Sequence, residues 1–578
     1  MYGAIMTIRR FRYVALCCLM LSANLAMGQS RRISKDLLHL RSGQWVNVIV
    51  QYRVPPTQKH FQGVVAKGGS LQANLPLING GAFTVKASSL AALANEPDVA
   101  YISPDRTVTA TATVTDFYDQ AVLAPYAWSQ SLNGSGIGVA VIDSGITSGK
   151  DFSPSTGKGS RVVYNQSFVS GQTSASDAYG HGTHVAGIIA GNGTNSKGTS
   201  YTKTFEGIAY GVNLINLRVL DQNGAGSDSQ VIAAIQKAIT LKSKYNIRVI
   251  NLSLGRPVFE SYKLDPLCQA VESAWKAGII VVVAAGNEGR NNSAGTDGYG
   301  TIGAPGNDPY VITVGAMKPM NTATRADDLI ASYSSKGPTL YDHIVKPDIV
   351  APGNMAASVL ASSTATLVKS YPGNVVALSS YSKSTKGTSA YFTLSGTSMA
   401  TPVVSGAAAL LLQRTPSLTP DQVKARLMKS AYKTFPREST ATDPSTGDKY
   451  TSQYDIFTIG AGYLDIQAAL SSTDLAPSTV GVAMSPAVAV DSSGNVYVVT
   501  NSSTIWGGGV VWGTSVVWGT AVFGTTDVSG KSVLWGSSVC WGTGTDTGYS
   551  VVWGTSVVWG TSTESATEAI SIAIQGEE

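Results

Sequence analysis

The chain has 578 residues, a net charge of +5 and only 13% charged residues. A chain of this length holds several domains, and its many Gly, Ser and Thr residues at low charge are typical of an extracellular protein. The charge is too small and diffuse for a nucleic-acid-binding protein, so nucleic acid is excluded as a partner.

Residues 1–28 have the pattern of a signal peptide. Arginines near the start precede the apolar stretch Val14–Leu21, and cleavage is expected near Gly28. We therefore expect a secreted or cell-surface-associated protein.

Cysteine usage adds little. Cys17 and Cys18 lie in the signal segment, so only Cys268 and Cys540 remain after its removal. These two lie in different regions, and the sequence leaves open whether they form a disulfide.

Residues 32–110 are predicted to form a small separate α+β domain. The segment VNVIVQY at 46–52 is typical of a strand, and SSLAALANEPDVAYI at 88–102 is typical of a helix followed by a strand.

Residues 117–472 are predicted to form an α/β domain with a doubly wound parallel sheet. Helix-like segments alternate with five buried apolar runs: Ile137–Ile142, Leu214–Leu220, Val249–Leu254, Ile279–Ala285 and Val311–Val314. Strands buried on both faces and joined by helices favour a parallel sheet. Active sites in such sheets lie at the carboxyl ends of the strands, which is where Asp143 and Asn287 fall.

Three segments of this domain carry the residue types of a nucleophilic site. SGTSMATP places Ser398 at the start of an apolar helix, whose N-terminus favours developing negative charge. A serine hydroxyl needs a base, which GHGTHVAG supplies as His181. The base needs an orienting acid, and VIDSG ends a buried strand with Asp143.

Taken singly, each of these residues has a commoner structural explanation. A Ser-Gly-Thr-Ser stretch is usually a turn, a strand-ending Asp is usually a cap, and a His on an apolar helix is usually a core residue. Their occurrence together, in the order Asp, His, Ser, favours the catalytic interpretation. His184 is interpreted as structural, because no HExxH pattern or third metal ligand accompanies it.

Over residues 117–472 the chain resembles the subtilisin-like serine proteases, or subtilases. The resemblance rests on VIDSGI, HGTHVAG, NLSLG, AAGNEG, KPDIVAPG and SGTSMATP, in family order. It implies a serine endopeptidase in which Asp143 orients His181, His181 is the general base and Ser398 is the nucleophile. It also implies that the Asn287 side chain stabilises the oxyanion, with no cofactor needed for the chemistry.

The resemblance extends to substrate binding and to the domain at 32–110. Ser253, Leu254 and Gly255 would bind a peptide as an added strand, which implies broad specificity toward protein or peptide substrates. Gly303 would lie at the floor of the main specificity pocket. The small domain resembles the inhibitory propeptides that precede subtilases, although a generic α+β domain remains an alternative.

Two segments depart from the family pattern. About forty residues, rich in Ser, Thr and Val, separate Gly353 from the SGTSMATP motif, and this loop could border the substrate cleft. The segment after the histidine helix lacks a clear run of calcium ligands, so a structural calcium ion and a role for Asp151 in holding it stay open.

A hexapeptide close to VVWGTS recurs near the end of the sequence, with tryptophans at Trp506, Trp512, Trp518, Trp535, Trp541, Trp553 and Trp559. A period of six residues keeps the rings on one face of an extended chain, which fits a β-solenoid or stacked hairpins. An aromatic surface for cell-surface attachment or self-association, or a disordered low-complexity tail, fits as well.

In a rival interpretation the repeats are the functional part, and the protease domain is a relic or only trims the protein itself. The predicted order is signal peptide 1–28, propeptide 32–110, catalytic domain 117–472, linker 473–502, repeats 503–562 and tail 563–578.

Overall fold

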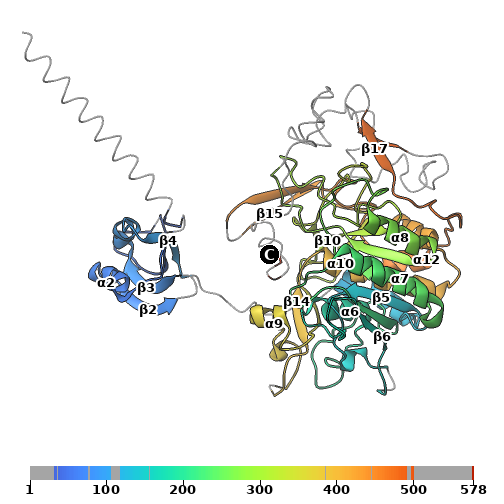
Figure 1. The fold of residues 1–578 in the computed structure, drawn as a ribbon, viewed down its shortest axis with the longest axis horizontal. Helices are drawn as coiled ribbons and strands as arrows, with labels where there is room; N and C mark the ends of the chain where they lie inside the picture. The colour runs from blue at the N-terminus through green and yellow to red at the C-terminus, as the bar shows by residue number, and fades with distance from the viewer. Residues whose placement is uncertain are drawn as a thin grey trace, which may run out of the picture. The chain divides into compact units, whose positions relative to one another are not determined.

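The structure is a computed structural model (Figure 1). It describes residues 32–34, 37–38, 40–75, 79–105, 118–154, 157–293, 295–384, 386–443, 446–490, 496–499, 574 and 576–577. The predicted signal peptide and the Trp-Gly repeats lie outside these residues. The chain divides into two compact units, Met1–Ala112 and Thr113–Glu578, and each is described by itself.

The first unit is the expected α+β domain. Its elements follow the order β1 (Trp45–Tyr52), α2 (Gln58–Ala66), β2 (Ser70–Leu75), β3 (Gly80–Lys86), α3 (Leu90–Ala94) and β4 (Val99–Pro104). The antiparallel sheet has the strand order β2-β3-β1-β4, a ferredoxin-like arrangement. Its core includes Val48, Val50, Phe83 and Leu93, which supports independent folding.

The second unit is built on a mainly parallel sheet of order β11-β10-β9-β8-β5-β7-β6, with β12 paired to β10. The five predicted apolar runs are confirmed as strands; the sheet comprises β5 (Gly138–Asp143), β6 (Val162–Ser167), β7 (Asn213–Arg218), β8 (Ile247–Leu252), β9 (Ile280–Ala284), β10 (Ile312–Lys318), β11 (Leu329–Ile330) and β12 (Ile349–Pro352). Only β11 runs antiparallel to its neighbour.

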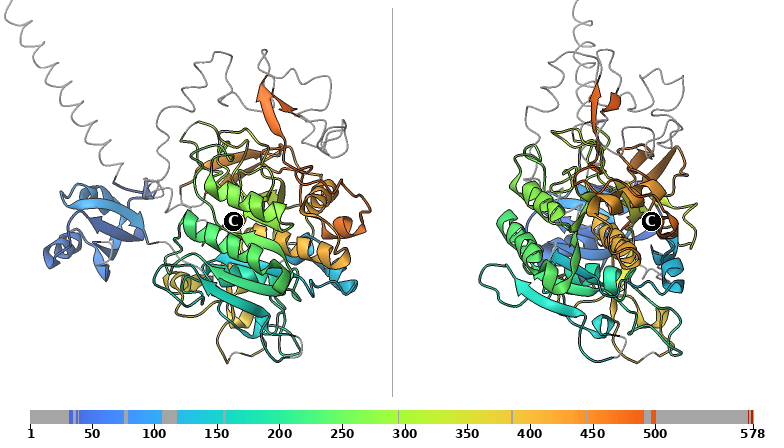
Figure 2. Two further views of the ribbon diagram at one scale, coloured as in Figure 1. Left: turned by 45° about the vertical axis from the view of Figure 1, so that its right-hand side comes forward. Right: turned by 90° about the vertical axis from the view of Figure 1, so that its right-hand side faces the viewer.

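Helices cover both faces of this sheet (Figure 2). On one side α6 (His181–Ala190) packs against α10 (Thr397–Arg414), and on the other α7 (Asp228–Tyr245) packs against α8 (Pro266–Lys276). The chain leaves β5 toward β6 and β7 and later returns on the other side of β5 to form β8. The strand order therefore reverses at β5, and such a switch point is where α/β sheets place their sites.

Glycines let the helix that begins at His181 approach β5 closely. A Cβ atom on Gly182 would lie 2.3 Å from the carbonyl oxygen of Gly145 and 3.1 Å from the Cβ of Asp143. No side chain fits in that space without a shift of the backbone. The glycines of VIDSG and HGTHVAG therefore bring the acid and the histidine together.

Smaller elements surround the sheet. They are α4 (Tyr118–Ala121), α5 (Ala124–Ser129), β13 (Ala356–Val359), α9 (Thr366–Ser370), β14 (Tyr391–Leu394), α11 (Pro420–Ser430), β15 (Glu438–Thr442), β16 (Lys449–Gln453), α12 (Ile466–Ser471), β17 (Ala487–Val490) and β18 (Val496–Val499), with short 3₁₀ turns at 150–152, 372–374 and 378–380. None of the helices in the described ranges is long and apolar enough to cross a membrane.

Residues just beyond 472, which the sequence assigned to a linker, pack on this unit. Asp421 of α11 accepts hydrogen bonds from the backbone of Gly481 and Ala483. Gln422 donates to the carbonyl oxygen of Ala476. The packed elements of the second unit therefore extend past the family-like element that ends near Ser472.

Candidate active site

Asp143 and His181, the expected acid and base, lie at the centre of the sheet's carboxyl edge. Asp143, the last residue of β5, is fully buried, and its Oδ1 lies 2.8 Å from Nδ1 of His181, the first residue of α6. Oδ1 also accepts the backbone N–H of Ser144 at 2.7 Å. The bond to Asp143 fixes the ring and leaves Nε2 of His181 as the nitrogen available to a substrate or nucleophile.

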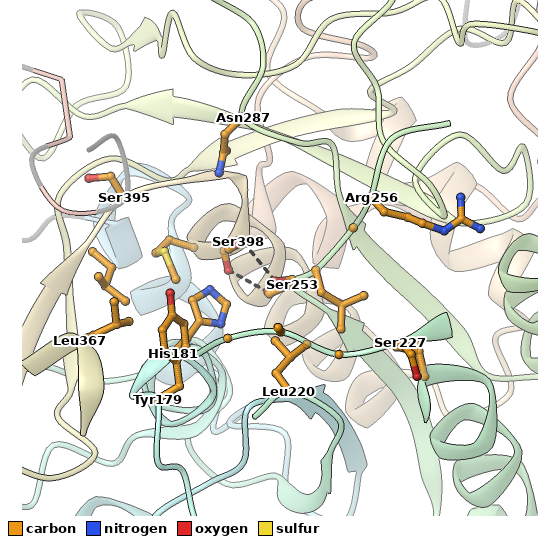
Figure 3. A pocket seen from close by; sticks show the side chains of 18 of the residues that line it. Tyr179, His181, Leu220, Ser227, Ser253, Arg256, Asn287, Leu367, Ser395 and Ser398 are labelled. Carbon is orange, nitrogen blue, oxygen red and sulfur yellow. Dashed lines mark hydrogen bonds between the residues drawn. The ribbon is translucent and has the colours of Figure 1, made fainter. Parts of the chain in front are cut away.

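Ser398 is held at the first turn of α10 by a reciprocal pair of bonds with Ser253 (Figure 3). Pro402 has no N–H, so the carbonyl oxygen of Ser398 lacks its usual partner four residues on. The hydroxyl of Ser253 donates to that oxygen at 2.8 Å. In return, Oγ of Ser398 donates to the carbonyl oxygen of Ser253 at 3.2 Å.

In this rotamer the Ser398 hydroxyl is directed to Ser253 and not to His181. Serine rotates about one torsion, and nucleophile–base hydrogen bonds are often loose without substrate. Both side chains line the same cavity, so a change of the Ser398 rotamer can turn the hydroxyl toward the base.

The amide of Asn287 is oriented by Thr397. Its Oδ1 accepts the backbone N–H of Thr397 at 2.9 Å and the hydroxyl of the same residue at 3.1 Å. Because Oδ1 is engaged, Nδ2 faces the cavity, and Figure 3 shows this nitrogen directed toward Ser398. The N–H of Ser398 is among the first four of α10, which have no partner within the helix. Together they provide two donors suited to an oxyanion.

His181, Asn287 and Ser398 line one open cavity of about 490 Å³. Ser253, Leu254 and Gly255, expected to bind the peptide backbone, line it together with His181, Asn287 and Ser398. Gly303 is not among the described lining residues. It lies next to Arg256, which lines the cavity: Ala304 and Arg256 form an antiparallel bridge, and a Cβ on Gly303 would lie 3.1 Å from the Arg256 carbonyl oxygen.

The sequence matches the subtilase family over residues 134–462. Serine protease AprX of Bacillus subtilis (strain 168) is 39% identical over 307 residues, which are 52% of this chain and 62% of AprX, less than two thirds of that protein. Subtilisin E of the same strain is 34% identical over 404 residues, which are 70% of this chain and 84% of subtilisin E. An alkaline protease of Shouchella clausii is 35% identical over 340 residues, 59% of this chain and 70% of that protein.

The chain belongs to the subtilase family. It is a serine protease, and the α/β parallel-sheet fold expected from the resemblance is confirmed. The glycines, the strand ends and the helix starts that carry the family motifs are the features that assemble the site of this subtilase.

Asp177, a buried acid in the loop before the histidine helix of this subtilase, was not identified from the sequence. Its Oδ1 accepts Oγ of Ser144 at 2.8 Å and the N–H of Gly180 at 2.7 Å, and its Oδ2 accepts the N–H of Thr183 at 2.8 Å. Burial raises the pKa of Asp177, and the hydrogen bonds oppose that rise. Asp177 is therefore a positioning residue that ties the start of α6 to the end of β5.

Two further cavity residues were not assigned from sequence. Leu367 of α9 belongs to the inserted loop before SGTSMATP, so that loop does border the cavity. Arg256 also lines it, but the guanidinium is paired with Asp228 and Asp265 and is directed away from Ser398 (Figure 3). The wall therefore gains no free positive charge at this point.

The structural interpretation of His184 is confirmed. The side chain is fully buried, and its Nε2 lies 3.0 Å from the carbonyl oxygens of Ala356 and Phe392. Burial lowers the pKa of His184 to about 3, so the ring is neutral and donates to these carbonyls.

The described residues contain no cluster of three His, Cys, Asp or Glu side chains suited to a metal ion. Asp151 instead accepts the N–H of Asn195 at 2.9 Å. Cys268 is buried as a free thiol, and Cys540 lies outside the part of the chain that the structure describes.

Proposed function

We propose that this subtilase is a secreted endopeptidase of broad specificity that works through an acyl-enzyme. The observation that carries the proposal is the convergence in one cavity of the Asp143–His181 pair, the Ser398 hydroxyl and the Nδ2 of Asn287. These are the parts that acyl transfer to a serine requires.

In the first half of the reaction, Nε2 of His181 takes the proton from Oγ of Ser398 as that oxygen bonds to the substrate carbonyl carbon. The negative charge on the carbonyl oxygen is stabilised by Nδ2 of Asn287 and by the N–H of Ser398. His181 then returns the proton to the leaving amine, and the C–N bond breaks. In the second half, water repeats these steps on the acyl group and restores Ser398.

Broad specificity is supported by how the substrate would bind. The backbone of Ser253, Leu254 and Gly255 lines the cavity and would pair with an extended peptide, which selects little for side chains. Asp228, an acid at the cavity wall, is paired with Arg256, which disfavours strict recognition of Lys or Arg.

The domain at 32–110 would act as the inhibitor of the enzyme before maturation, and self-cleavage would release it. Support comes from its compact α+β fold and its position ahead of the catalytic unit. Secretion is supported by the signal-peptide pattern of residues 1–28.

The test is casein hydrolysis by the wild type and by Ser398→Ala, His181→Ala and the double variant. Ser398 and His181 act as one unit, so each single variant should lose nearly all activity and the double variant little more. Ser417→Ala, at an exposed serine just after α10, is the matched control and should stay active. Additive losses would contradict the assigned roles, and a wild type that cleaves only itself would favour the rival in which the repeats carry the function.

A further inference from the structure

Ile574, Gly576 and Glu577, close to the end of the sequence, contact the catalytic unit, and Glu577 does so through a buried carboxylate. The Glu577 carboxylate accepts the N–H of Ser332 at 2.8 Å, its hydroxyl at 2.5 Å and Nη2 of Arg290 at 3.2 Å. Nζ of Lys318 lies 4.0 Å from Oε1 of Glu577. Glu577 is only 7% exposed, so these partners are needed to offset the loss of water around its charge.

The groups that receive Glu577 are themselves held in place. Nε of Arg290 donates to the Ser332 hydroxyl at 2.7 Å, its Nη1 pairs with Asp443 at 3.3 Å, and its guanidinium lies over the Tyr450 ring. The Arg290 side chain is 7% exposed. The receiving site is therefore preorganised, and Arg290 would keep one acidic partner if Glu577 were removed.

Two asparagines form hydrogen bonds with the backbone of Ile574 and Glu577. Asn354 donates from Nδ2 to the carbonyl oxygen of Glu577 at 2.7 Å and accepts the Glu577 N–H at 2.8 Å. Asn374 donates to the carbonyl oxygen of Ile574 at 2.5 Å. Asn354 is 8% exposed, so its amide is committed to this segment.

Gly576 allows the chain to pass close to Ser395, three residues before Ser398, and to Met355. A Cβ at this position would lie 2.6 Å from Oγ of Ser395 and 2.7 Å from Sδ of Met355, and the residue has a φ of +65°. The positive φ therefore favours glycine, and any larger residue would also force the Ser395 and Met355 side chains to shift.

These contacts of Glu577 and the two asparagines place Ile574 in the catalytic cavity. Ile574 is 8% exposed and lines the cavity together with Leu367, Leu394 and Ser395. In Figure 3, Ser395 and Leu367 lie across His181 and Ser398 from Ser227 and Arg256. Since the acyl half of a substrate would follow Ser253–Gly255, Ile574 is on the side where the leaving half must pass.

We propose that the catalytic unit carries a binding site for Ile574, Gly576 and Glu577 of its own chain, and that Glu577, once seated there, holds Ile574 as a specificity-determining wall for substrate residues after the scissile bond. The ligand is an aliphatic residue followed two positions later by Gly-Glu. The specificity role rests on the proposed endopeptidase function, while the seating of the segment does not.

The activity test compares two substrates with the same acyl residues: a peptide anilide, and a quenched peptide with four further residues after the scissile bond. Releasing Ile574 should raise kcat/KM for the long peptide by about threefold or more in Glu577→Ala, Gly576→Ala and Ile574→Ala, with a change under about 1.5-fold for the anilide. Glu438→Gln, at an exposed strand residue, is the control and should change neither. Equal changes for both substrates, or no change, would overturn the specificity role.

The seating is tested without turnover. Hydrogen exchange of full-length Ser398→Ala protein should show a protected amide at Glu577, whose N–H bonds to Asn354, and adding Glu577→Ala should speed the exchange of this amide by about tenfold or more. Absent protection in Ser398→Ala overturns the inference whatever the activity, whereas protection in a chain that hydrolyses neither substrate would sink only the proposed function. Loss of residues 574–577 from the mature protein, read by intact mass, would overturn a role in the mature enzyme.

Discussion

His181 is set between two acids with different roles. Asp143 bonds to its ring, and Asp177 holds the loop and the helix start from which the ring projects. Burial lowers the pKa of His181, but the charge and hydrogen bond of Asp143, with a smaller contribution from Asp177, raise it, and the net shift is upward. The ring is therefore a stronger base than free histidine.

This upward shift predicts the acidic limb of the pH profile. A general base must be neutral, so kcat/KM should fall as pH drops through the His181 pKa, at a pH above the ordinary histidine value of about 6.5. Asp143→Asn should move the limb to lower pH and reduce the plateau by about 10⁴, a magnitude taken from the equivalent change in another serine protease. The measurement is initial rate on a peptide anilide from pH 5 to 10.

Asp448→Asn, at an exposed carboxylate, is the control and should leave that profile unchanged. An acidic limb that does not move in Asp143→Asn would mean that a group other than His181 sets it.

The residues that the sequence revealed are those that sit in short local motifs. Asp143, His181, Asn287 and Ser398 each belong to such a motif. The structure brings His181, Asn287 and Ser398 to one cavity, and buried Asp143 bonds to His181. The link between Ser253 and the carbonyl oxygen of Ser398 joins residues far apart in the chain, and only the lack of an N–H at Pro402 hinted that this carbonyl needs a partner. Asp177 stands three residues before Gly180. An Asp at this spacing before a helix can accept a backbone N–H at the helix start, so the sequence alone could have marked it as a positioning residue.

At the scale of elements, a buried charge cluster joins the sheet to α11. The Asp348 carboxylate bonds to Nζ of Lys346 at 2.7 Å, lies 3.2 Å from Nζ of Lys424 on α11, and accepts the N–H of Thr313 on β10 at 2.8 Å. Ser485, from the segment beyond 472, donates to the same carboxylate. The side chains of Asp348 and of both lysines are fully buried, so each charge depends on the others.

Removing the central acid should therefore destabilise the fold. Asp348→Ala leaves two buried ammonium groups without their acid, and we expect a loss of about 3–5 kcal/mol in the free energy of unfolding. Urea titration in a Ser398→Ala background avoids self-digestion. Asp474→Ala, which breaks a partly exposed pair with Lys429, is the control and should cost less than about 1 kcal/mol.

If Asp348→Ala lowers the free energy of unfolding no more than Asp474→Ala does, the buried lysines do not depend on the Asp348 charge. In the sequence, Lys346 and Asp348 were noted only as part of the KPDIVAPG motif that carries the family resemblance. Its partners on α11 and at Ser485 come from distant segments, and nothing in the local pattern of either identifies an ion pair.

At the scale of the whole molecule, the division between Ala112 and Thr113 falls within the segment where we expect maturation. Self-cleavage between Thr109 and Gln120 should separate the first unit from the active enzyme. In Ser398→Ala, expressed alone in a protease-deficient host, the precursor should persist apart from signal removal, as judged by intact mass. Cleavage of that inactive variant in this segment would assign processing to another enzyme.

The Trp-Gly repeats come after β18 and before Glu577, which bonds to the catalytic unit. The repeats are therefore flanked on both sides by residues that belong to that unit. Replacing residues 506–562 by a Gly-Ser linker of equal length removes the tryptophans and keeps this attachment. Because no catalytic motif lies there, peptide hydrolysis should stay within about threefold of wild type, while cell-associated or self-associated protein should shift to the soluble fraction. Truncation after residue 502 also removes Glu577 and should in addition raise cleavage of long peptides. If the linker variant alone loses activity or folding, the tryptophans pack against the protease and the repeats are part of its structure rather than an attachment module.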